Sequence, residues 1–283
     1  MTAIGRLLLV AAAALVVACG APGRPPSLVV GATADAPGTV LAHVYAAALR
    51  SYGTVVRIET AAGTDDALRG LDSGAVTLVP GFTGRLLQRF DPESTARSAA
   101  QVYRALLGSL PEGIAAGDYA PAAEDKPALA VTAATAQSWG SRDLVAVERN
   151  CPVVTVGTVT GRIARPAVGD CTLRAPREFT TDAALFDGLA AGAVTAAWTS
   201  TADTGVPDGV VVLVDRKPAL IPAQNVVALY RRNELSTLQL RAVNEVAGVL
   251  DTAGLVDMLR RVEAGAAPDA VADEWLAANP LTD

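Results

Sequence analysis

The sequence is poor in aromatic residues, histidine and cysteine, and these shortages exclude several classes of function. Aromatic residues make up 4% of the 283 positions, and the single histidine is His43, with no acidic or nucleophilic partner near it in sequence. No Cys-x-x-Cys pair is present, so the usual ligands of a zinc site are missing. Gly-x-Ser-x-Gly, His-Glu-x-x-His and Ser-x-x-Lys motifs are also missing. We predict no metal, no cofactor and no catalytic residue, and a surface position without function for His43.

Positive charge is also in short supply. The chain has 23 lysines and arginines against 29 aspartates and glutamates, which gives a formal net charge of −6. A protein that binds nucleic acid or an anionic membrane surface needs a cationic surface. Nucleic acid is therefore not an expected partner.

The first 27 residues are typical of an exported, anchored protein. One basic residue, Arg6, precedes an apolar run from Leu7 to Ala18 that is short for a membrane span. We predict a signal peptide at residues 1–18. The stretch from Val16 to Cys19 resembles the bacterial lipoprotein cleavage box, which implies a lipid on Cys19, a proline-rich tether at 19–27 and a location on the outer face of the cell membrane. A plain leader with an incidental Cys19 is the alternative.

Two further cysteines, Cys151 and Cys171, remain in the exported part. An even pair in an oxidising compartment is most simply a disulfide, which here closes a loop of about twenty residues and contributes about 3 kcal/mol. We predict this bond.

Two stretches of the chain read almost alike. Residues 70–77 are GLDSGAVT and residues 188–195 are GLAAGAVT, and each continues into a short apolar piece. Gly74 and Gly192 suit the left-handed position that ends a helix, and the following valine suits the start of a strand. A true repeat predicts two lobes of similar α/β build, with the residues after each strand facing a shared cleft. Chance similarity between alanine-rich stretches is the alternative.

The order of elements predicts the domain organisation. A strand at 28–31, a helix at 39–52, a strand at 55–60 and a helix from Thr64 to Ser73 follow one another as in a mainly parallel sheet. A strand at 226–229 returns the chain to the first lobe, and helices follow to the end. We assign residues 28–126 with 224–283 to the first lobe and 127–223 to the second, with the two crossings as a hinge.

Several segments resemble the solute-binding proteins of quaternary-amine (glycine betaine, choline, carnitine) ABC importers. These include VVGAT at 29–33, AGTDDALRGLDSGAVTLVPGFTG at 62–84 and VVLVDRKPALIPAQNVVAL at 211–229. Residues 81–84 look like the end of the family's Tyr-Pro-Glu-Tyr-Thr-Gly signature. The resemblance covers nearly the whole mature chain. It implies a two-lobed, periplasmic-binding-protein-like fold, a small-molecule solute and an ABC permease as partner.

The aromatic cage of that family is largely missing here. The family surrounds a trimethylammonium group with aromatic rings and holds the carboxylate end with basic groups. The signature tyrosines are replaced by Val79 and Phe82, and the other cage positions fall near Pro127, Ser200 and Gln224. Trp139 and Trp198 are candidate replacement rings, with a packing role as the alternative. From the matched positions and these replacement rings, we predict the following ligand-binding residues: Thr33, Phe82, Thr83, Trp139, Arg165, Trp198, Ser200 and Gln224.

Two other functions compete with solute capture. A lipoprotein that kept the binding fold but serves as a scaffold for other envelope proteins would also lack the cage. An exported enzyme would have to use carboxylates such as Glu178, Asp182 or Asp203, which solvation or helix capping explains more simply. We rank solute binding first, scaffold second and enzyme third.

Overall fold

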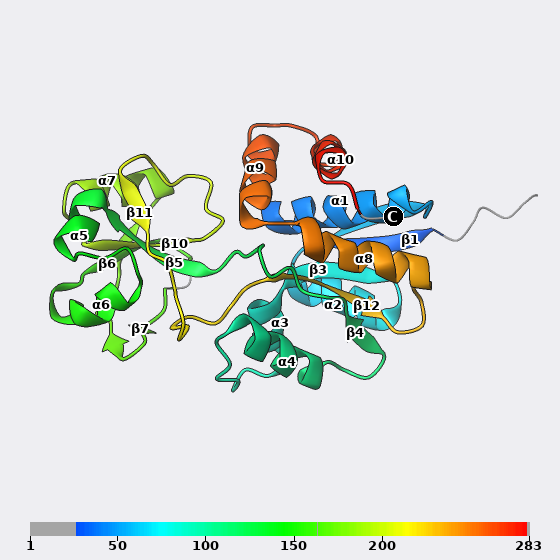
Figure 1. Cartoon of the computed structure of the whole chain (residues 1–283), viewed down its shortest axis with the longest axis horizontal. Helices are drawn as coiled ribbons and strands as arrows, with labels where there is room; N and C mark the ends of the chain where they lie inside the picture. The colour runs from blue at the N-terminus through cyan, green and yellow to red at the C-terminus, as the bar shows by residue number, and fades with distance from the viewer. Residues whose placement is uncertain (1–26, 163, 282–283) are drawn as a thin grey trace, which may run out of the picture.

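The computed structural model describes residues 27–162 and 164–281. The predicted leader, Cys19 and all of the tether except Ser27 lie outside these ranges. No helix among the described residues has the length and apolar character needed to cross a membrane. Two lobes are visible in Figure 1, and the chain enters the second lobe in green and leaves it in yellow.

The first lobe is built on a five-stranded sheet in the order β2-β1-β3-β12-β4. The strands are β1 (Leu28–Thr33), β2 (Val56–Ala61), β3 (Leu78–Phe82), β4 (Ile114–Ala116) and β12 (Val226–Arg231). β1 runs parallel to β2 and β3, whereas β12 runs antiparallel to β3 and β4.

Helices cover both faces of this sheet because successive strand residues point to opposite sides. Val30 and Leu78 pack with one group of helices, and Val29 and Val79 pack with the other. The first group is α1 (Ala36–Ser51), α8 (Thr237–Val249), α9 (Thr252–Glu263) and α10 (Pro268–Ala278); the second is α2 (Thr64–Ser73), α3 (Thr83–Phe90) and α4 (Ala99–Ser109). Both strand faces are therefore apolar, as the nearly continuous hydrophobic runs predict.

The second lobe contains a second five-stranded sheet, in the order β11-β5-β10-β6-β9. Its strands are β5 (Pro127–Thr132), β6 (Val156–Val159), β9 (Arg177–Phe179), β10 (Ala196–Ser200) and β11 (Val210–Val212). The helices are α5 (Ala133–Ser138), α6 (Val145–Arg149) and α7 (Asp182–Ala190), and a short hairpin joins β7 (Ala167–Val168) to β8 (Cys171–Thr172). The predicted disulfide is confirmed: Cys151 in the 3-10 helix Cys151–Val153 bonds to Cys171 on β8.

The two sheets have the same topology, which confirms that the sequence repeat is real. The strand that follows each repeat stretch is β3 in the first sheet and β10 in the second, and each is the central strand of its five-stranded sheet. Each of these strands has one parallel and one antiparallel neighbour. Gly74 and Gly192 are left-handed, with φ of 80° and 73°, and their N–H groups donate to Leu71 and Leu189. The two-lobed fold is therefore as predicted. Each sheet is mixed rather than mainly parallel, because β12 in the first lobe and β5 in the second pair antiparallel with both neighbours.

A few local predictions are wrong. The apolar residues from Val153 to Val156 predict a strand, but the strand lies at 156–159, because Cys151–Val153 form a 3-10 turn beside the disulfide. Thr64 is typical of an N-cap by residue type, but it is the first helical residue of α2, and Gly63 takes the N-cap position. His43 is half-buried rather than on the surface, and burial lowers its pKa. The segment 111–127 has no clear periodicity and reads as a loop, but it contributes β4.

Candidate ligand-binding cleft

A cleft of about 900 Å³ lies between the lobes. Its second-lobe wall comes from the carboxyl ends of β6 and β10 and from the loops after them. Its first-lobe wall comes from α3, α9 and the two segments that cross between the lobes. Carboxyl ends of strands are where open α/β sheets bind ligands, and the volume suits a small molecule.

The floor on the second-lobe side is formed by Trp198 and Thr158. Ala197 of β10 pairs with Gly157 of β6, so Trp198 and Thr158, one residue further along, are neighbours on adjacent parallel strands. Both side chains are buried, with exposed fractions of 4% and 2%. Trp198 Nε1 and Thr158 Oγ1 have no hydrogen-bond partner within the described ranges. These two polar atoms are unsatisfied in a cleft wall.

Charged side chains line the rest of this wall. Arg162 makes a two-pronged contact with Asp182, with Nη1 to Oδ1 at 2.6 Å and Nη2 to Oδ2 at 2.9 Å. Its Nη1 also lies 3.9 Å from Asp203 Oδ2. Asp203 accepts hydrogen bonds from the hydroxyl of Thr199 and from the N–H of Gly205, the latter at 2.8 Å. These contacts hold the rim in one arrangement.

Arg165 differs from the other charged residues of the cleft. Its side chain is half-buried in the cavity wall, and no hydrogen bond or ion pair to it is found in the part of the chain described. Burial lowers the pKa of the guanidinium, and the nearby positive charge of Arg97 lowers it further. Arg165 is therefore a cation in an unfavourable electrostatic environment.

The first-lobe wall is organised by Arg85 on α3. Its Nη2 lies 2.7 Å from Asp125 Oδ2, and its guanidinium carbon lies 4.7 Å from the centre of the Phe82 ring. Its backbone N–H donates to Gln224 Oε1 at 2.8 Å, so Gln224 caps the start of α3. A Cβ added at Gly84 would come within 2.4 Å of the Ala223 carbonyl oxygen. The close approach of α3 to the returning segment therefore requires glycine here.

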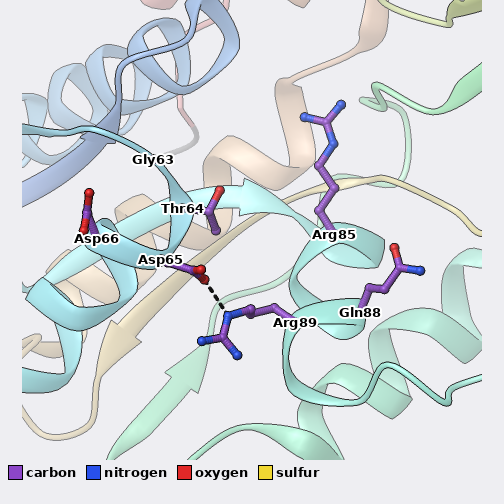
Figure 2. A pocket seen from close by; sticks show the side chains of 7 residues that line it. All are labelled: Gly63, Thr64, Asp65, Asp66, Arg85, Gln88 and Arg89. Atoms are coloured by element: carbon purple, nitrogen blue, oxygen red, sulfur yellow. Dashed lines mark hydrogen bonds and ion pairs between the residues drawn. The ribbon is translucent and has the colours of Figure 1, made fainter. Parts of the chain in front are cut away.

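A second hollow of about 460 Å³ lies beside this wall, on the first lobe alone. Figure 2 shows Arg89 turned toward Asp65, which joins α3 to the start of α2, while Arg85 points away from that pair. Arg85 and Gln88 line both hollows. A solute in this hollow would contact a single lobe, so we take the cleft between the lobes as the candidate site.

The predicted ligand residues divide into two groups. Trp198, Ser200, Arg165 and Gln224 all line the cleft. Four others do not appear among the lining residues: Thr33, Phe82, Thr83 and Trp139.

Each residue of the second group has neighbours within its own lobe. Thr33 Oγ1 donates to Asp35 Oδ1 at 2.6 Å. Phe82 is 4% exposed in the first-lobe core, and Thr83 is fully buried and accepts the Asn225 N–H at 3.1 Å. Trp139 is half-buried at the end of α5 and packs against the second-lobe core. The guanidinium of Arg85, which lines the cleft, lies over the Phe82 ring.

Sequence reasoning missed Thr158, Arg85 and Asp125. A signal for Thr158 was present, because Val30-Gly31 of β1 and Val156-Gly157 of β6 occupy equivalent places in the two sheets. Placing the strand three residues too early concealed this match. Arg85 and Asp125 lie forty residues apart, and no local pattern joins them.

The sequence matches the OpuAC family, the substrate-binding domain of the ABC-type glycine betaine transport system, over residues 26–278. The chain belongs to this family. It is accordingly the substrate-binding component of an ABC importer, acts on the extracytoplasmic side and is not an enzyme. The family captures a solute and works with an ABC transporter, which confirms those two partners in outline.

Solved structures show the same fold. Apo YehZ from Escherichia coli is 19% identical with a TM-score of 0.71, covering 90% of this chain and 99% of that one. A glycine betaine/carnitine/choline ABC transporter structure is 15% identical with a TM-score of 0.74, covering 91% and 99%. A choline-binding protein in complex with choline is 11% identical with a TM-score of 0.55, covering 90% and 89%. No curated protein sequence matches the chain.

Proposed function

We propose that the chain captures a small polar or zwitterionic solute, of the osmoprotectant or quaternary-amine kind, between its lobes and delivers it to the permease. The observation that carries this proposal is the cleft of about 900 Å³ lined by both lobes, with side chains of both charges and buried polar atoms in its wall. Such a site suits a small molecule that bears both a polar and a charged end.

Within this proposal, Trp198, Ser200, Arg165 and Gln224 contact the solute. Thr158 and Arg85 join them, because they line the same cavity. Phe82 and Thr83 contribute from beneath, by holding α3 in place. Thr33 and Trp139 are not among the residues that line the cavity, so their contact with the solute stays a prediction.

Binding is proposed to favour a closed arrangement of the lobes, with the hinge at the boundaries near residues 126 and 224. The two crossing segments run side by side there and pair through an isolated antiparallel β-bridge between Glu124 and Asn225. Lys126 Nζ lies 3.4 Å from Asp215 Oδ2 at the same place. On the rim, Thr204 of the second lobe donates to Glu263 of α9 at 2.7 Å. These contacts are few enough to shift when a solute bridges the lobes.

Thermal unfolding tests the proposal. A solute that binds the folded protein at about a hundred times its dissociation constant adds about 2.7 kcal/mol of stability and raises the melting temperature. We expect at least one member of a panel of betaine, choline, carnitine, proline, sugars, amino acids and polyols to do so for residues 27–283. A panel with no effect would contradict solute capture and favour the scaffold function.

Cys19 is proposed to carry the lipid anchor. We expect the full chain to fractionate with membranes after expression in a bacterium with lipoprotein processing, and Cys19→Ser to release it to the soluble fraction. The reason is that stable anchoring at this position requires the acylated cysteine. Membrane association of Cys19→Ser equal to that of the wild type would contradict the assignment.

A further inference from the structure

Hydrogen-bonding groups in the cleft are unevenly satisfied. Four carboxylates line it, and each already has a partner: Asp125 has Arg85, Asp182 has Arg162, Asp203 has Thr199 and Gly205, and Glu263 has Thr204. Among the fully buried polar atoms and the charged groups that line it, three have no hydrogen-bond or ion-pair partner within residues 27–162 and 164–281, namely Thr158 Oγ1, Trp198 Nε1 and the Arg165 guanidinium. Each of these three groups can donate a hydrogen bond.

This pattern limits what the solute can offer. An indole N–H and a guanidinium can only donate, so their partner must be an acceptor, and a hydroxyl can donate to the same kind of group. A buried polar group without a partner is costly, and so is a half-buried arginine near a second arginine. An oxyanion would satisfy all three donors and neutralise the charge of Arg165.

The positions of the donors agree with a common partner. Thr158 and Trp198 are neighbours on β6 and β10 at the carboxyl ends of these parallel strands. Val156 and Ala196, two residues earlier, pack with Trp198 in the same cluster, so Thr158 and Trp198 share one face of the sheet. Arg165 lies on the loop that follows β6 and lines the same cavity.

A quaternary-ammonium end has little to bind here. Trp198 is the one aromatic residue among those lining the cleft in the described ranges, and a single ring cannot enclose a trimethylammonium group. The carboxylates that would attract a cation are already paired with cations or hydrogen-bond donors.

We infer, resting on solute capture as proposed above, that this cleft selects its solute by an oxyanion such as a carboxylate, held by Thr158, Trp198 and Arg165. Trp198 acts in this site through its N–H rather than through the face of its ring. The methyl groups and the positive charge at the other end of the solute contribute little to selection. The substrate class is therefore small carboxylates, with or without a quaternary amine.

Four probes of similar size separate the two ends of the solute. Glycine betaine and choline share the trimethylammonium group, but only the first has a carboxylate. In 3,3-dimethylbutyrate a carbon replaces the nitrogen of betaine, and 3,3-dimethylbutanol has neither charge. In calorimetric titrations of residues 27–283 we expect betaine to bind at least about tenfold more tightly than choline, since hydrogen bonds to a charged group are the stronger ones. We expect the affinity of 3,3-dimethylbutyrate to lie within about fivefold of that of betaine.

The opposite ranking would overturn the inference. Choline binding as tightly as betaine, with no measurable binding of 3,3-dimethylbutyrate, would mean that the cation is selected. Binding of another solute in the panel but of neither carboxylate would also overturn it, while solute capture itself would stand. If no solute in the panel binds, both the oxyanion inference and solute capture are contradicted.

Variants give a readout that needs no ligand. Thr158→Val removes the unpaired hydroxyl and keeps the shape, so we expect the melting temperature without ligand to stay equal or rise, while carboxylate affinity falls about tenfold. Thr83→Val is the matched control, because this threonine is equally buried but its hydroxyl accepts the Asn225 N–H. We expect Thr83→Val to lower the melting temperature. If Thr158→Val lowers it by as much, the Thr158 hydroxyl has a structural partner and the inference is wrong.

Trp198→Phe separates the N–H of the indole from its ring. The variant keeps an aromatic face, so a stacking role would leave affinity nearly unchanged. We expect carboxylate affinity to fall about tenfold, with choline affinity unaffected. Unchanged carboxylate affinity in Trp198→Phe would remove the indole N–H from the site.

Discussion

Replacing Phe82 with alanine is expected to lower the free energy of unfolding by about 3–5 kcal/mol. The ring is 4% exposed in the first-lobe core, so its removal leaves a cavity where β3 meets α3. It also removes the surface beneath Arg85, whose guanidinium carbon lies 4.7 Å from the ring centre. Solute affinity should fall as well, because Arg85 loses its support. Urea unfolding of the variant and the wild type measures the first effect.

Phe82→Leu is the matched control for a direct contact between the ring and the solute. Leucine keeps most of the volume, so we expect a loss of stability of about 1 kcal/mol and an affinity within about twofold of the wild type. A stacking ring would give the reverse result, with normal stability and a large loss of affinity in Phe82→Leu. That outcome would restore Phe82 to the ligand contacts that the family resemblance implies.

Loss of the disulfide is the second large effect that we expect. Changing Cys151 and Cys171 together to alanine should lower the free energy of unfolding by about 3 kcal/mol, because the closed loop spans a sequence separation of 20. The same loop carries Thr158 and Arg165, so solute affinity should fall too. Alanine avoids placing a hydroxyl where Cys171 is buried.

Reductant provides the control for this prediction. Wild-type protein in reductant should lose about as much stability as the double variant, and the double variant should not respond to reductant. A wild-type melting temperature that is the same with and without reductant, after thiol counting shows the bond to be broken, would mean that the disulfide contributes nothing measurable.

Much of the fold follows from the sequence because its signals are local or repeated. Gly74 and Gly192 mark helix ends through a backbone conformation that few other residues adopt, and the helices near the C-terminus follow the 3.6-residue period. The mixed character of the sheets was not predictable in this way, because the direction of β5 and β12 depends on long-range pairing. A run of apolar residues looks the same in the sequence whether the strand pairs parallel or antiparallel.

The site was harder to predict than the fold. Phe82 is the last residue of β3, and the alternation of the strand turns it into the core, whereas the equivalent Ser200 of β10 lines the cleft. Periodicity does not reveal which end residue faces a ligand. Thr158 became visible only when the correct bounds of β6 put it beside Trp198. The place of Arg165 in the cleft wall, in a loop before Pro166, agrees with the position that the resemblance implies.

The central claim is that the solute binds in the cleft between the lobes, against Trp198. The chain has three tryptophans, so a Trp139→Phe, Trp275→Phe variant leaves Trp198 as the single reporter. Titration with the solute that raises the melting temperature most should change the Trp198 fluorescence in a saturable way, with the same dissociation constant as calorimetry. A solute that stabilises this variant but leaves the Trp198 emission unchanged would bind elsewhere and contradict the account.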